Sequence, residues 1–450
     1  MKRILTLLLL SAVLFQVSCK KDDDLSMGGD HPKLIDGTLA QQWFKLECTI
    51  VKETPGMFPP QAARAFGYTG LALYETVVQG WPEAKSLAGQ ISGLNAGMLP
   101  MADTDQYSYD WALASNAALA DIMRKMFEIK ITPANLEAID ALEQLWEDEL
   151  SNRLEPAVVE RSVAFGKAMA TAIYAYSASD GGHQSQVDPF QLPYSWPTIT
   201  GAWVPTGAAL NPLSPRWAEN RAFVFDNISQ AQPAPHIPFS TDPSSDFYGA
   251  AMEVYTIVTN ATDDQKEIAR FWADDPFNTC TPTGHTFNIL TQLLEEDNAN
   301  LAKCAVAYAK LGLAENDAFI CCWKTKYDHF LIRPVSYIKQ HIDPAFATVI
   351  GTPPFPAYTS GHATEAAAGS QVFIEMFTNG DGNYNFTDRT QLQFGFPIRT
   401  YTNFNDMAEE CADSRLFGGI HYDMDNQLGL TMGRIIGQNV ITKIDWPTSF

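Results

Sequence analysis

The 450-residue sequence is poor in basic residues, with 30 Lys and Arg against 52 Asp and Glu and a formal net charge of −22. No Lys/Arg-rich stripe interrupts this excess, so nucleic acid is excluded as an expected partner. After the N-terminus, no apolar run approaches the roughly 18 residues that a membrane-spanning helix needs. The sequence also has no CxxC, CxxCH or GxGxxG pattern, so a zinc site, a haem and a flavin are not expected.

The N-terminus carries the features of an export signal. Lys2 and Arg3 precede a short apolar run at residues 4–15, and Cys19 follows Val17-Ser18. This order is typical of a bacterial lipoprotein. We therefore expect a signal peptide at 1–18, a lipid on Cys19 and a tether at 19–30. The predicted protein is an exported outer-membrane lipoprotein that faces the periplasm or the cell surface and touches the membrane only through this lipid.

The composition supports a large folded core, since 46% of the residues are hydrophobic and 12% are aromatic. Apolar residues recur mainly at spacings of three and four, which predicts a mostly α fold, a large helical bundle with few short strands. We expect one helical domain at 31–450, with a catalytic half at about 265–450 and one small hairpin in 380–400. The expected helices are 60–79, 108–129, 133–153, 156–178, 246–260, 263–273, 286–313, 315–327, 363–377 and 425–443.

Three further features of the sequence allow more than one interpretation. Residues 181–244 are rich in Pro and aromatic side chains, and a loop of this length often covers a functional site. Six cysteines remain after Cys19, which allows from zero to three disulfides. The loop 381–388 could bind calcium or form a plain turn.

The residues with chemical potential fall into three clusters after residue 320. In the first, Lys326 and Arg333 are seven residues apart, a spacing that two turns of a helix would place on one face, and Pro334 then turns the chain. Two cations on one face repel each other unless an anion lies between them. A solvated basic face is the plain alternative for this pair.

The second cluster is Ser360-Gly361-His362, which leads into a helix of small residues. A hydroxyl and the free N–H groups of a helix N-terminus together suit an oxyanion. The helix dipole would lower the pKa of His362 and keep it available as a base. Alone, the same residues could form an ordinary helix start.

The third cluster contains Arg415, His421 and Asp425. Arg415 offers a fork-shaped cation for an oxyanion. Asp425 follows His421 at i+4, so a helix would place its carboxylate beside the imidazole and leave the other ring nitrogen as a nucleophile or metal ligand. Together, the three clusters predict one pocket for phosphate or vanadate.

The combined pattern K-x6-RP, SGH and SR-x5-H-x3-D resembles the type 2 phosphatidic-acid-phosphatase superfamily, which contains acid phosphatases and vanadium-dependent haloperoxidases. The segment from Phe355 to Thr364 looks like the haloperoxidase branch, although Thr359 stands where a proline is usual. Trp323 also matches that branch, and residues 271–285 resemble a segment of its bacterial members.

The resemblance implies a helical haloperoxidase fold with vanadate as the cofactor. It implies an axial bond from His421 to vanadium, oxyanion binding by Lys326, Arg333, Ser360, Gly361 and Arg415, and acid/base chemistry at His362. Trp323 and Phe355 would wall the halide site, although each could equally be core. Asp275 would support one of the arginines, with Asp274 as the rival candidate. The substrates implied are hydrogen peroxide, a halide (iodide or bromide) and small organic acceptors, with phosphate as a competing ligand.

Two other functions remain open at this point. The same pocket could serve a secreted acid phosphatase that forms a phosphohistidine at His421. A surface lipoprotein that only captures oxyanions or glycans would not need poised histidines.

Overall fold

A computed structural model describes residues 30–450, so the expected signal peptide, Cys19 and the tether up to residue 29 lie outside the described residues. The described chain is mostly α-helical, as predicted, with a single two-stranded sheet. The helices are α1 (Thr38–Glu53), α2 (Pro59–Val77), α3 (Trp111–Phe127), α4 (Pro133–Ser151), α5 (Pro156–Ser177), α6 (Asn227–Gln230), α7 (Asp246–Thr259), α8 (Asp263–Phe271), α9 (Thr281–Glu296), α10 (Leu301–His329), α11 (Pro334–His341), α12 (Gly361–Phe377), α13 (Phe404–Phe417) and α14 (Asp423–Lys443). Short 3-10 helices occur at η1 (Pro32–Leu34), η2 (Val78–Gly80), η3 (Ala96–Met98), η4 (Trp217–Glu219) and η5 (Thr390–Phe394).

Local capping explains where several helices begin. The Thr132 side chain accepts a hydrogen bond from the N–H of Asn135, and Pro133 occupies the first turn of α4. Thr262 and Gln265 form a reciprocal capping box on α8. These arrangements satisfy N–H groups that have no partner within the helix.

The predicted boundary between residues 286–313 and 315–327 is wrong. The chain breaks earlier, where Asn298 adopts a left-handed conformation (φ 51) and Asn300 caps α10. α10 then continues without interruption to His329. The break falls in the polar stretch 295–300 (Glu-Glu-Asp-Asn-Ala-Asn), a turn signal that the spacing of apolar residues does not register. Four of the described helices, α1, α6, α11 and α13, were not expected.

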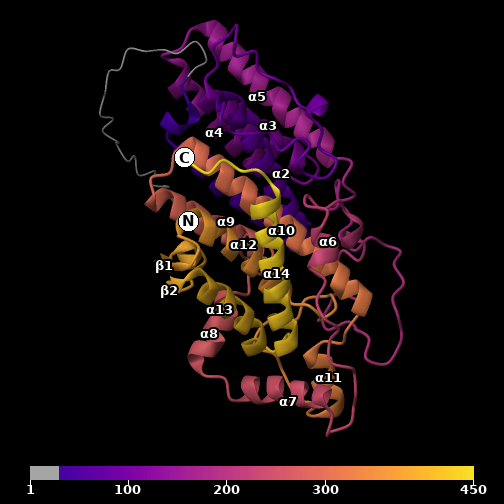
Figure 1. The fold of residues 1–450 in the computed structure, drawn as a ribbon. Coiled ribbons are helices and arrows are strands. Elements are labelled where there is room, and N and C mark those ends of the chain that lie inside the picture. Colours follow the sequence, from indigo (N-terminus) through magenta and orange to yellow (C-terminus); the bar gives the residue numbers. More distant parts are fainter. Residues whose placement is uncertain (1–29) are drawn as a thin grey trace, which may run out of the picture.

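α10 lies at the centre of the molecule, with α2 on one side and α12 and α14 on the other (Figure 1). Glycines permit the closest crossings. A Cβ on Gly312 would lie 2.8 Å from the Cα of Gly67, and a Cβ on Gly433 would lie 2.1 Å from the backbone oxygen of Thr364. The largest hydrophobic core extends from α1 to the residues after α14.

The expected hairpin is present, with β1 (Asn383–Asp388) antiparallel to β2 (Arg399–Asn403) and η5 between the strands. In the loop before β1, the Asp381 carboxylate accepts hydrogen bonds from the backbone N–H and the side-chain amide of Asn383, both at 3.0 Å. These bonds form a turn.

The long segment 181–244 packs against the helices along one side of the molecule (Figure 1). Trp203 and Trp217 are buried, and the Trp196 ring lies 6.0 Å from that of Trp203. All six cysteines of the described chain are buried and free. Across residues 30–450, no helix combines the length and apolar character required to span a membrane.

Candidate active site

The three predicted clusters converge at the ends of helices. Lys326 lies in the last turn of α10, and Arg333 immediately precedes α11. The expectation that both share one helical face is wrong, because Phe330 adopts a left-handed conformation (φ 51) that ends α10 between them. The chain turns there, and the two cations meet through this turn.

Lys326 is fully buried, and its ammonium donates hydrogen bonds to the carbonyl oxygens of Pro356, Ala357 and Thr359, the first two at 3.0 Å. Burial lowers the pKa of Lys326 to about 7. The lysine thus holds the loop that leads into α12 and places a cationic group behind it.

Arg333 is also fully buried and joins two parts of the site. Its Nε donates to the carbonyl of Phe355 at 2.7 Å, and its Nη1 donates to the carbonyl of Ile420 at 2.8 Å and lies 3.0 Å from Nε2 of His421. Burial lowers the pKa of Arg333 to about 10. Its Nη2 is a buried donor without a partner among the described residues.

His421 lies between Arg333 and Asp425. Its Nδ1 is 2.8 Å from Asp425 Oδ2, so this nitrogen carries the proton and Nε2 faces the guanidinium as an acceptor. Burial, and then the charge of Arg333, hold the pKa of His421 well below its usual range. Burial raises the pKa of Asp425 to about 7, although Lys326 and Arg333 oppose that shift. The pairing follows the predicted i+4 spacing, but His421 precedes α14, and Asp425 lies in its first turn.

Ser360 caps α12, because its hydroxyl accepts a hydrogen bond from the N–H of Ala363 at 3.4 Å. Gly361 and His362 form the first turn, where helix N–H groups face outward. A Cβ on Gly361 would meet only ordinary contacts, the nearest at 3.6 Å on the Trp323 ring.

His362 is partly exposed and lines a cavity together with Arg415. Its Nε2 lies 3.4 Å from Nη1 of Arg415. Burial and the Arg415 charge lower the pKa of His362 well below its usual value. Arg415 is itself buried and bonded to Ser414 Oγ at 2.9 Å and to the Ala269 carbonyl at 3.2 Å.

The three cations therefore share an unusual environment. Lys326, Arg333 and Arg415 are at most 1% exposed, yet no carboxylate forms an ion pair with any of them within residues 30–450. Burying unpaired charges is costly unless an opposite charge joins them. The free Nη2 of Arg333, the acceptor Nε2 of His421 and the N-terminus of α12 fit a tetrahedral oxyanion such as vanadate or phosphate.

The aromatic and acidic residues around the cavity differ in whether they line it directly. Phe355 lines the cavity, with the Arg333 guanidinium 4.9 Å from its ring centre. Trp323 lies behind it, with ring centres 5.0 Å apart, and donates to the Leu213 carbonyl at 3.2 Å. Asp275 lines the cavity. Burial raises the pKa of Asp275, and the nearby Arg415 charge opposes that rise. No ion pair joins Asp275 to an arginine among the described residues.

Asp274, the rival candidate, belongs to a network that the sequence did not indicate. The buried His285 lies between Asp274 Oδ2 and Asp388 Oδ2, each 2.8 Å from a ring nitrogen. Both nitrogens must donate to carboxylates, so the ring is an imidazolium, and these two charges raise the pKa of His285 against the effect of burial. The Trp272 ring stacks on it at 4.6 Å. This network fixes the loop that carries Asp275.

The cavity has a volume of about 220 Å³ and is not confined to the predicted catalytic half. Phe58, Pro59 and Leu213 form part of its wall. These apolar residues carry no chemical signal in the sequence, although Leu213 belongs to the long segment 181–244 that we expect to cover a functional site.

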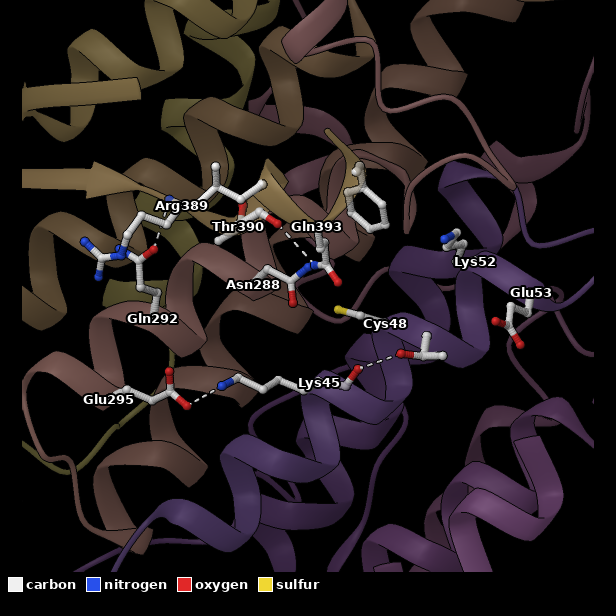
Figure 2. Close-up of a pocket in the computed structure, with 13 residues that line it drawn as sticks. Lys45, Cys48, Lys52, Glu53, Asn288, Gln292, Glu295, Arg389, Thr390 and Gln393 are labelled. Carbon is white, nitrogen blue, oxygen red and sulfur yellow. Dashed lines mark hydrogen bonds and ion pairs between the residues drawn. The ribbon is translucent and has the colours of Figure 1, made fainter. Parts of the chain in front are cut away.

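A larger cavity, about 710 Å³, lies between α1, α9 and η5 (Figure 2). Its two lysines already have partners, because Lys45 pairs with Glu295 and Lys52 lies 4.9 Å from the centre of the Phe394 ring. It contains none of the predicted site residues. The smaller cavity is therefore the candidate active site.

Comparisons with known proteins point to one family. The sequence model of the second helical-bundle domain of vanadium chloroperoxidase matches residues 306–447. Vanadium chloroperoxidase of Curvularia inaequalis is 31% identical over 135 residues, which span 24% of this chain and 22% of that protein.

Solved structures extend the similarity over nearly the whole chain. The crystal structure of a bacterial vanadium-dependent iodoperoxidase is 32% identical, with a TM-score of 0.82, and the match covers 92% of this chain and 98% of that one. A bacterial vanadium-dependent chloroperoxidase in apo form shares the fold at 15% identity and a TM-score of 0.63, over 87% of this chain and 95% of that one. With its fold, its matched length and its identity to the iodoperoxidase, the chain belongs to the vanadium-dependent haloperoxidase family.

Proposed function

We propose that this protein is a vanadate-dependent haloperoxidase that uses hydrogen peroxide to oxidise a halide to hypohalous acid. The observation that carries the proposal is the group of three buried cations without carboxylate partners, arranged beside the acceptor nitrogen of His421. An oxyanion with two or three negative charges would compensate them.

Each residue of the anion site would have a separate role. His421 Nε2 would bond to vanadium, with Asp425 fixing the tautomer through Nδ1. Arg333 and Arg415 would bind the oxygens, and the charge of Lys326 would act from behind the 356–359 loop. Ser360 and the Gly361 N–H would hydrogen-bond the remaining oxygens. Bound vanadate supplies Lewis acidity toward peroxide without a change in its own oxidation state.

His362 would move the proton. It is the histidine that lines the cavity, and its lowered pKa keeps it unprotonated near neutral pH. A neutral imidazole can accept a proton from incoming hydrogen peroxide and return it to the departing oxygen. Phe355 would form the wall beside the halide, and Trp323 would support that wall.

The halide is proposed to be iodide or bromide, with iodide favoured because the structure that matches at 32% identity is an iodoperoxidase. Phosphate is the proposed competing ligand, since it offers the same tetrahedral oxygens to the same cations.

The test is reconstitution of vanadate-free protein with orthovanadate, followed by parallel assays of peroxide-dependent oxidation of iodide, bromide and chloride. We expect oxidation of iodide that depends on vanadate and is inhibited by phosphate. His421→Ala should abolish vanadate binding, measured by equilibrium dialysis, and activity. His341→Ala, at the exposed end of α11, is the matched control. Release of phosphate from an aryl phosphate, without halide oxidation, would instead identify a phosphatase that acts through His421.

We also propose that the protein is exported and anchored by a lipid on Cys19. The basis is the sequence order of Lys2, Arg3, the apolar run and Cys19. Metabolic labelling with a fatty acid tests this, and Cys19→Ser should remove the label. A labelled Cys19→Ser protein, or an unlabelled wild type, would refute it.

A further inference from the structure

The imidazole of His362 has two different kinds of neighbour. Its Nε2 lies 3.4 Å from Nη1 of Arg415, and the ring also donates a hydrogen bond to the backbone carbonyl of Ala273. A guanidinium only donates and a carbonyl only accepts. The proton of the neutral ring therefore lies on Nδ1, and Nε2 keeps its lone pair. This tautomer places a proton acceptor beside Arg415.

The Ala273 carbonyl belongs to a peptide unit with an unusual orientation. The next residue, Asp274, has a left-handed backbone (φ 46), which is unfavourable for a residue other than glycine. Because the peptide unit is planar, rotation about the N–Cα bond of Asp274 determines how the Ala273 carbonyl is turned relative to the Asp274 side chain. A group that holds this side chain therefore also holds the carbonyl.

Two hydrogen bonds hold the Asp274 side chain. Its Oδ2 lies 2.8 Å from Nδ1 of His285, and its Oδ1 accepts from the side-chain amide of Gln391 at 2.7 Å. His285 is anchored on its other side by Asp388, which lies 2.8 Å from Nε2. Asp274, His285 and Asp388 are at most 2% exposed, so water does not compete for these bonds. The network thus offsets the backbone strain and fixes the Ala273 carbonyl.

Loss of this network would release the strain at Asp274. The residue would return to a right-handed or extended backbone, and the peptide unit with the Ala273 carbonyl would rotate. His362 would then lose the acceptor at Nδ1, and its ring would be free to carry the proton on either nitrogen. A proton on Nε2 removes the lone pair beside Arg415.

We propose that His285 is a positioning residue, which acts through Asp274 and the Ala273 carbonyl to keep the proton of His362 on Nδ1. His285 itself is buried and is not among the residues that line the cavity. The inference rests on the proposed function for the use of the Nε2 lone pair, which accepts a proton from hydrogen peroxide. The tautomer itself is a property of the protein without vanadate.

NMR can measure the tautomer without vanadate or turnover. In full-length protein with isotope-labelled histidine, the His362 nitrogen signals are those that disappear in His362→Gln. We expect the wild type to carry the proton on Nδ1 alone. His285→Gln should show both tautomers, because one amide group replaces two opposed donors and reaches only one of the carboxylates. Asp274→Asn should have the same effect, since asparagine tolerates the left-handed backbone but offers one acceptor oxygen instead of two.

Asp388→Asn is the matched conservative variant. Asp388 Oδ1 accepts from the backbone N–H and the hydroxyl of Thr390 at 2.8 and 2.7 Å, and an asparagine keeps this oxygen. Its amide can donate to Nε2 of a neutral His285, which still donates from Nδ1 to Asp274. The charge is lost, but the hold on Asp274 remains. We therefore expect Asp388→Asn to keep the wild-type tautomer of His362.

A turnover assay supplies the second comparison, with each variant first shown to be folded by circular dichroism. In reconstituted enzyme, His285→Gln should lower the kcat of iodide oxidation about fivefold, the effect of one lost hydrogen bond, and leave the KM for iodide within about twofold. In a His362→Gln background the same substitution should have no further effect, because the residue that it positions is absent. Asp317→Asn changes a buried carboxylate outside the network, which accepts from the N–H groups of Phe223 and Val224, and should keep the wild-type kcat and tautomer.

Four results would overturn the proposal. They are a wild-type His362 with its proton on Nε2, a wild-type tautomer in the folded His285→Gln or Asp274→Asn protein, a mixed tautomer in Asp388→Asn, and a further fall in kcat when His285→Gln is added to His362→Gln. If His285→Gln does not fold, Asp274→Asn decides the question. If the wild type does not oxidise iodide at all, the proposed function fails, while the NMR result still decides whether His285 sets the tautomer.

Discussion

Binding of a tetrahedral dianion should draw about one proton onto Lys326. Burial lowers the pKa of this lysine from 10.5 to about 7, which corresponds to roughly 5 kcal/mol against its charged form. A dianion at roughly 5 Å, with an effective dielectric constant of about 20, contributes roughly 7 kcal/mol in the opposite direction. A bound anion can therefore raise the pKa of Lys326 enough to restore its positive charge.

This coupling determines how the affinity for the anion changes with pH. Above pH 7 the anion-free site has a mostly neutral Lys326, whereas the anion-bound site keeps the proton. The affinity should therefore fall about tenfold per pH unit between pH 8 and pH 9, with about one proton taken up per anion. Tungstate is the suitable probe, because it stays a dianion over this range. Calorimetry in two buffers of different ionisation enthalpy measures the uptake.

Two variants make the result specific. Lys326→Met should bind tungstate more weakly, with a flat pH dependence and no proton uptake from this group. Lys310→Met is the matched control, because Lys310 is equally buried but pairs with Glu375 at 2.7 Å, away from the site. Uptake that persists in Lys326→Met, or is absent from the wild type, would refute the assignment of the proton to Lys326.

Three further outcomes are expected. His285→Gln should destabilise the protein by about 3 kcal/mol at pH 6. Because the pKa of His285 is raised in the folded protein, its contribution to the free energy of unfolding is fully present below the unfolded pKa of roughly 6.5. Urea unfolding should show that this contribution becomes smaller as the pH rises above that value. Gly433→Ala should cost about 2 kcal/mol in thermal unfolding, because its Cβ meets backbone at 2.1 Å, whereas Gly249→Ala has open space. His362→Ala should lower the kcat of iodide oxidation by about 100-fold and change tungstate affinity less than about threefold.

Each of these three predictions would be contradicted by a specific outcome. An equal effect of His285→Gln at pH 6 and pH 10 would exclude a charged imidazole. Equal melting temperatures for the two glycine variants would show that α12 and α14 separate easily. A His362→Ala protein with normal kcat would leave proton transfer to another group.

Much of the anion site could be predicted from the sequence because its members are chemically distinctive. Arg333, His421 and Asp425 are close in space, as their types and spacing suggested. The route by which they meet was not predictable. Lys326 and Arg333 are joined by a left-handed turn rather than by a helical face, and the apolar pattern there does not mark the end of α10.

Contacts between distant segments account for most of what the sequence did not reveal. Asp388 is 103 residues from His285, and neither residue type nor spacing connects them. Phe58 and Leu213 contribute only apolar surface to the cavity, a property shared with many core residues. The break at 297–300 depends on the conformation of Asn298, which helical periodicity does not report.

The carbonyl of Leu213 has a consequence for how the chain can be divided. It accepts hydrogen bonds from the indole of Trp323 and the hydroxyl of Tyr327, two neighbours of Lys326 on α10. A fragment starting near residue 265 would keep every charged group of the proposed anion site but would lose Leu213 and the cover that it forms over this part of α10. Water would then reach the cations from above, and their attraction for an anion would weaken with the rising local dielectric. The proposed binding of small oxyanions therefore requires the full-length fold, and we expect it to be lost in the C-terminal bundle alone.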